Sequence, residues 1–178
     1  MFRLIVICIL CLSVAVVDAQ ALKPTAYYMG LPTVSQAAKD YHAGTVPAGD
    51  NDRTYSIADS MSTLNNDTRP FYIFLVSKML LTANRQLSIG LGRTCRDFLQ
   101  RNPDAVVGLL FSTSVKPAYK YQWARVIALD IMTACPGDKM KCMKTSRLLA
   151  LQHCREQNEE GLETIYSAVR ASIRNAGR

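Results

Sequence analysis

Apolar residues recur with the period of an α-helix over most of this chain. From Asp52 onward they are spaced three or four residues apart, which places them on one face of each of several helices. The first such face consists of Tyr55, Ala58, Met61 and Leu64. The segment after Pro70 is apolar on nearly all sides, which predicts a central helix buried on several faces.

A further helix is expected over 85–100, where Gly90 and Gly92 would allow a second helix to approach closely. Its apolar face is Leu87, Leu91, Cys95, Phe98 and Leu99. Asn102 and Pro103 are residue types that begin helices, so a short helix is expected after them.

The helical period continues to the end of the chain. An apolar stripe ends at the turn sequence Cys135-Pro136-Gly137, and its members are Trp123, Val126, Ile127, Ile131 and Ala134. A helix over 138–153 is expected to face inward with Met140, Met143, Leu148 and Leu151. The last helix is expected to face inward with Leu162, Ile165, Tyr166, Val169 and Ile173.

No stretch alternates apolar and polar residues as a half-buried strand would. The prediction is therefore an all-α, single-domain bundle of five to seven helices over 53–178. Residues 20–52 are rich in proline, glycine and tyrosine and are expected to form an irregular arm with one short helix over 33–41. That arm could be a binding tail or a strap across the core.

The first residues have the pattern of a signal peptide. Arg3 precedes an apolar run, and Val17 and Ala19 occupy the −3 and −1 positions of a cleavage site, so 1–19 would be removed. No later stretch approaches about 18 consecutive apolar residues, so no integral membrane segment is expected. The predicted location is periplasmic or extracellular.

Four cysteines lie after the predicted cleavage site, and an even number in an exported chain predicts two disulfides. Cys142 and Cys154 lie twelve residues apart on one expected helix, or roughly 18 Å, which is too far for a bond. Cys135 and Cys154 would lie at opposite poles of two antiparallel helices. The expected pairs are therefore Cys135–Cys142 and Cys95–Cys154.

Cys135, Cys142, Cys154 and His153 are four residues of types that bind zinc. Their spacing lacks the short Cys-x2-4-Cys unit of structural zinc sites, and His153 and Cys154 would point about 100° apart on a helix. A cysteine nucleophile needs a thiolate that an oxidised chain does not retain. No metal, no cofactor and no catalytic residue is therefore assigned.

The formal net charge of +7 is either an ordinary solubility charge or an indication of an acidic partner, such as an anionic cell-envelope polymer, a membrane surface or an acidic protein. A basic face is expected on the helix over 138–153, either as a solvated surface or as a binding surface for phosphate, a glycan or an acidic partner. Its members are Lys139, Lys141, Lys144 and Arg147. Arg93, Arg96 and Arg101 would extend it if the two helices lie together. No nucleic-acid reader motif is present, so nucleic acid is not an expected partner. The sequence does not fix the oligomeric state.

Acidic residues supply the other candidate chemistry. One ridge opens the last helix and complements the helix dipole; its members are Glu156, Glu159, Glu160 and Glu163. Asp130 lies within the Trp123 stripe, where it is either paired with a buried arginine or tyrosine or is a functional acid.

Two functional hypotheses follow. The favoured one is an exported, non-enzymatic helical module that binds a protein, in its most specific form a periplasmic inhibitor or immunity protein against an envelope-degrading toxin. The alternative is an exported hydrolase that uses Asp130 and the glutamate ridge on a cell-wall or glycan substrate.

Overall fold

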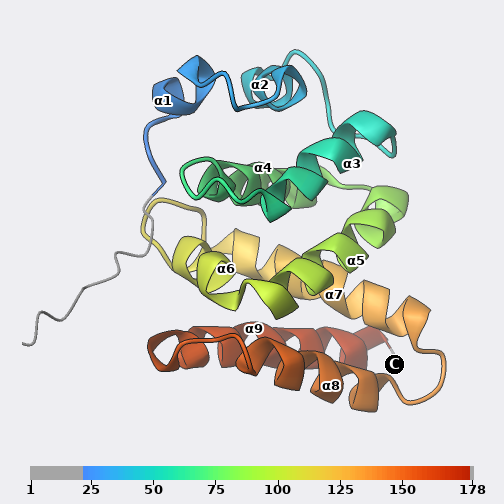
Figure 1. Ribbon diagram of the computed structural model, residues 1–178. Helices are drawn as coiled ribbons and strands as arrows, with labels where there is room; N and C mark the ends of the chain where they lie inside the picture. Colours follow the sequence, from blue (N-terminus) through green and yellow to red (C-terminus); the bar gives the residue numbers. More distant parts are fainter. Residues whose placement is uncertain (1–21, 177–178) are drawn as a thin grey trace, which may run out of the picture.

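The computed structural model describes residues 22–176 (Figure 1), so the predicted signal peptide over 1–19 lies outside the described residues. Within this range the chain is all-helical and contains no strand. The α-helices are α1 (Thr25–Gly30), α2 (Gln36–Ala43), α3 (Asp52–Asp59), α4 (Arg69–Thr82), α5 (Arg85–Arg101), α6 (Pro103–Leu110), α7 (Ala118–Ala134), α8 (Lys139–Leu151) and α9 (Glu156–Ala176). A 3-10 turn, η1 (Ser60–Ser62), follows α3. None of these helices combines the length and the apolar composition needed to cross a membrane.

The all-α prediction is confirmed, but these nine helices exceed the five to seven expected. Seven of the nine, α3 to α9, make up the predicted helical region, and the additional two lie in the N-terminal segment, where α2 overlaps the short helix expected over 33–41 and α1 was not expected. Tyr28 of α1 is buried and stacks on Phe71 of α4 with 4.5 Å between ring centroids. The Ser35 N–H donates to the Tyr72 hydroxyl over 3.1 Å. This segment therefore covers α4 as part of the core.

Helix starts follow capping chemistry. Asn84 accepts a hydrogen bond from the Leu87 N–H (2.9 Å) at the start of α5, and Asp138 accepts one from the Lys141 N–H (2.9 Å) at the start of α8. Pro103 stands in the first turn of α6, where its missing N–H costs no helical bond. These local signals make the starts of the longer helices predictable from sequence.

The centre of the fold is α7, which packs against α4, α5, α8 and α9. Trp123 is fully buried, and its Nε1–H donates to Ser77 Oγ of α4 over 2.8 Å. Ser77 in turn donates to the Ile73 carbonyl, so the buried polar atoms are satisfied. Gly92 permits the expected close approach of α5 and α7, because a Cβ there would lie 2.5 Å from the Val126 carbonyl oxygen.

Helices α8 and α9 form an antiparallel pair at one end of the molecule, with α1 and α2 at the other (Figure 1). The Tyr166 hydroxyl donates to the Ser146 carbonyl over 3.0 Å and lies 2.9 Å from Ser146 Oγ. Ser146 and Ala150 face inward, whereas Leu148 is 56% exposed, so its predicted inward orientation was wrong. Small residues on the inward face let α8 lie close to its neighbouring helices. Because Ser146 and Ala150 occupy that face, Leu148 points outward.

One of the two predicted disulfides is present. Cys135 and Cys142 are bonded across the α7–α8 turn with 6.6 Å between their α-carbons. The predicted Cys95–Cys154 bond was wrong, since both thiols are free within the described residues. Burial raises the pKa of the Cys95 thiol well above its usual range.

Cys95 and Cys154 are not bonded because the start of α6, and not the middle of α5, lies beside Cys154. Cys154 Sγ lies 3.9 Å from Asp104 Oδ1, at the start of α6. Cys95 lies six residues before the end of α5, roughly 9 Å back along the helix axis. Asp104 therefore occupies the place beside Cys154 that the sequence assigned to Cys95.

Candidate functional site

Three of the four residues of the predicted basic face are exposed on α8. Lys139, Lys141 and Lys144 point to solvent, and within the described part of the chain none has an ion-pair partner. Arg147 differs because it turns toward α9 and forms a two-pronged ion pair with Glu163, in which Nε lies 2.8 Å from Oε2. The pair neutralises Arg147, so the basic face consists of the three lysines.

Exposed leucines adjoin these lysines. Residues 141, 145 and 149 follow each other at a four-residue spacing and form one row along α8, on the side toward α5. Lys144 and Leu148 form the next row at the same spacing, farther from α5. Leu148 is 56% exposed and Leu149 is 42% exposed. We call this combination of Lys141, Lys144, Thr145, Leu148 and Leu149 the α8 surface.

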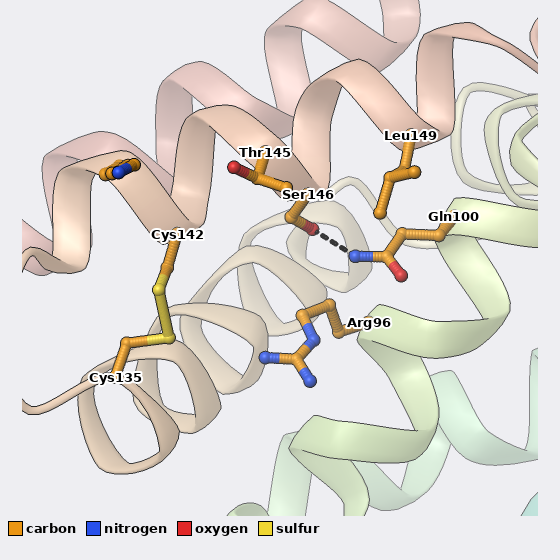
Figure 2. Close-up of a pocket in the computed structure, with 8 residues that line it drawn as sticks. Arg96, Gln100, Cys135, Cys142, Thr145, Ser146 and Leu149 are labelled. Carbon is orange, nitrogen blue, oxygen red and sulfur yellow. Dashed lines mark hydrogen bonds between the residues drawn. A yellow bond between two sulfur atoms is a disulfide. The ribbon is translucent and has the colours of Figure 1, made fainter.

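A pocket of about 380 Å³ opens between α5 and α8 beside this surface. Its walls include the Cys135–Cys142 disulfide, Leu149 and Thr145, and its polar groups include Arg96, Gln100 and Lys141. Figure 2 shows Arg96 extending from α5 into the space between the disulfide and the hydrogen-bonded pair of Gln100 and Ser146. We call this hollow the α5–α8 pocket.

Asp130 of α7 holds Arg96 in place. Arg96 Nη1 lies 2.7 Å from Asp130 Oδ2, and Arg96 Nε lies 3.5 Å from Asp97 Oδ1. The contact with Asp130 is an ion pair, and Asp130 Oδ2 accepts no hydrogen bond from the described residues. Burial raises the pKa of Asp130, and the charge of Arg96 offsets part of that effect. The expectation that an arginine would pair with this buried carboxylate is confirmed.

The other acidic residues lie in separate surroundings. Glu163 pairs with Arg147, and Glu160 lines a second hollow of about 560 Å³ between α6 and α9. Asp104, which sequence reasoning did not single out, accepts hydrogen bonds from the Arg155 N–H (3.0 Å) and the Asn158 side-chain amide (2.7 Å). Its role is to join the start of α6 to the α8–α9 turn.

The residues considered for zinc do not form a site. Cys135 and Cys142 are bonded to each other, which removes two of the four ligands. Over residues 22–176, no three side chains of histidine, cysteine, aspartate or glutamate converge as metal ligands would. His153 is exposed after the end of α8.

Sequence reasoning singled out the two lysines of the α8 surface but did not single out Gln100, Thr145 or Leu149, which line the pocket beside it. Gln100 and Thr145 are polar residues of ordinary helices, and only the packing of α8 on α5 brings them to one pocket. Leu149 could have been placed from the sequence. It lies four residues after Thr145 and eight after Lys141, so the three residues share one face of the helix.

Comparison with known proteins gives no match: no protein-family model, no curated protein and no solved structure is significantly similar to this chain. The functional argument therefore rests on the α8 surface and the α5–α8 pocket.

Proposed function

We propose that this protein is an exported, non-enzymatic helical module that binds an acidic protein partner through the α8 surface. The observation that carries the proposal is the coincidence on one helix of unpaired lysines, Lys141 and Lys144, with two adjacent exposed leucines, Leu148 and Leu149. Apolar side chains rimmed by charge are typical of protein-binding surfaces.

Both parts of this surface would contribute to binding. Covering two half-exposed leucines is worth on the order of 1 kcal/mol each. Lysines without an acidic neighbour attract a negatively charged partner and speed its association. The interaction is therefore expected to weaken as salt rises, with the apolar contribution remaining.

Export rests on the sequence of 1–19 and agrees with the Cys135–Cys142 disulfide, since such bonds persist in oxidising compartments. The most specific form of the proposal is an inhibitor or immunity protein against an envelope-degrading toxin. Enzymes that cleave glycans carry paired carboxylates in their active sites. A lysine-bearing helix is complementary in charge to such a site.

The alternative, a carboxylate-dependent hydrolase, draws no support from the arrangement of the acids. Asp130 is paired with Arg96 and Glu163 with Arg147. A glycosidase needs two carboxyl groups facing one substrate, about 5 to 10 Å apart. Asp130, Glu163 and Glu160 instead lie at the α5–α7 contact, in the α8–α9 pair and at the α6–α9 hollow, respectively.

A pull-down from an extract of the producing organism tests the binding proposal. Wild-type protein is expected to retain its partner at about 50 mM salt and to release most of it at about 500 mM, because salt screens surface charges. The double variant Lys141→Glu/Lys144→Glu is expected to lose the partner at both concentrations.

The matched control is Arg53→Glu/Lys116→Glu, which makes the same change in net charge at exposed positions of α3 and of the α6–α7 loop. It should retain the partner as wild type does. A partner that binds the two double variants equally well would disprove a role for the α8 surface.

A further inference from the structure

The α5–α8 pocket and the α8 surface share residues. Lys141, Thr145 and Leu149 line the pocket on the side toward α5 and belong to the exposed surface on the other side. A partner that covers the α8 surface would therefore also cover the mouth of the pocket. This pocket of about 380 Å³ is large enough to receive a side chain of that partner.

The polar groups of the pocket suit an anion. Lys141, which has no ion-pair partner among residues 22–176, supplies a positive charge at its edge, and Arg96, although paired with Asp130, adds guanidinium N–H donors. Gln100 uses one N–H of its side-chain amide to bind Ser146 Oγ over 2.8 Å and has a second N–H to offer. The walls are apolar, because the disulfide and Leu149 contribute sulfur and methyl groups. A ligand with a short aliphatic stem and a terminal carboxylate matches both features.

The charges around Arg96 favour a single carboxylate. Asp97 lies 3.8 Å from Arg93 and Asp130 lies 2.7 Å from Arg96, so these four charges compensate one another, whereas Lys141 has no ion-pair partner among residues 22–176. The group therefore keeps one uncompensated positive charge. One incoming carboxylate would balance it, and a second would not be favoured.

The pocket is also fixed in shape before any ligand arrives. Asp130 holds Arg96, and Ser146 holds Gln100 while itself bonded to Tyr166. The disulfide fixes the wall formed by Cys135 and Cys142. Groups that are already ordered lose little further conformational entropy on binding.

From this geometry we infer that the α5–α8 pocket receives a glutamate side chain from an acidic segment of the partner, an inference that rests on the proposed binding function. The carboxylate lies toward Arg96 and Lys141, and its methylene groups contact the disulfide and Leu149. The bound glutamate thereby fixes the position of the partner segment along α8.

A peptide titration tests this inference. The probe is a fluorescein-labelled peptide of repeating glutamate-glutamate-leucine, and the comparison peptide has glutamine in place of every glutamate. Binding to the full chain is followed by fluorescence polarisation. Binding contacts are followed by NMR of the Gln100 side-chain amide and the Leu149 methyl groups. We expect the glutamate peptide to bind and to shift both sets of signals, and the glutamine peptide to do neither.

Two variants address the pocket itself. Thr145→Phe fills it without changing charge, and Lys141→Gln removes one of its cations; each is expected to weaken binding of the glutamate peptide about tenfold or more. Thr164→Phe is the matched control, an exposed threonine of α9 that lines the α6–α9 hollow. It should leave the affinity unchanged.

The outcomes separate the two proposals. If Lys144→Glu weakens binding but Thr145→Phe does not, the partner uses the α8 surface without the pocket and the inference is overturned. If the Gln100 and Leu149 signals do not move, the inference is likewise overturned. If neither Lys144→Glu nor Thr145→Phe matters while the peptide still binds, the proposed role of α8 fails with it.

Discussion

The ion pair between Arg96 and Asp130 determines the charge beside the α5–α8 pocket. Asp130 is only 6% exposed, and burial raises its pKa in spite of the arginine beside it. Arg147 illustrates the same rule at the other side of α8, because its partner Glu163 removes it from the binding surface. The identity of a residue gives its charge, but the charge that it offers to a partner depends on its neighbours.

The raised pKa of Asp130 gives a pH dependence of known sign. Between the unfolded value of 3.8 and the higher folded value, the folded protein binds more protons than the unfolded chain. The contribution of Asp130 to the free energy of unfolding therefore falls as pH rises through this window. Relative to Asp130→Asn, the wild type should gain stability as pH falls from about 7 to about 4. Urea unfolding of both proteins across this range measures the difference.

The Asp130→Asn variant cannot titrate at this position, so it serves as the control for all other acidic groups. A wild type that instead loses stability relative to the variant toward acid pH would mean that attraction to Arg96 outweighs burial, and that the folded pKa lies below 3.8.

At the scale of single elements, helix starts and most of the inward faces were predictable, as the buried faces of α5 and α9 show, whereas the orientation of Leu148 on α8 was not. Asn84, Asp138 and Pro103 mark the starts of α5, α8 and α6 through local chemistry that sequence displays directly. The short helix α2 was predicted with slightly different bounds, over 33–41, whereas α1 was not predicted, because six residues are too few for a clear period. Leu148 was misplaced because apolar character alone suggested the inward face, whereas packing favoured the smaller Ser146 and Ala150.

The α7–α8 turn is held by the Cys135–Cys142 disulfide, and its removal should be measurable. The bond closes a loop with a sequence separation of seven residues. On the chain-entropy model such a loop is worth about 2 to 3 kcal/mol, so Cys135→Ser/Cys142→Ser should lower the free energy of unfolding by that amount. Cys154→Ser changes a half-buried free thiol and should cost less than about 1 kcal/mol. Equal losses in urea unfolding would show that the disulfide does not stabilise the fold.

At the scale of the whole molecule, the packing of the helices determines the separation of Cys95 from Cys154 and the α5–α8 pocket, neither of which could be predicted from the sequence. The all-α class and the hydrophobic core of the described residues follow from the periodic pattern of apolar residues. The Cys95–Cys154 pairing was wrong because it required a register between α5 and the end of α8 that no local signal encodes. The α5–α8 pocket could not be foreseen for the same reason, since Arg96 and Gln100 meet Lys141 and Thr145 only through that packing.

The central claim is that the α8 surface contacts the partner, and site-specific photo-cross-linking in the producing organism tests it most directly. A benzophenone side chain is placed at Leu148 or, as a control, at Leu64, an exposed leucine outside α8 that is 92% accessible. The account predicts a cross-linked complex with a single acidic protein from position 148 and none from position 64, and loss of that complex in Lys141→Glu/Lys144→Glu. A complex formed from Leu64 and not from Leu148 would contradict it.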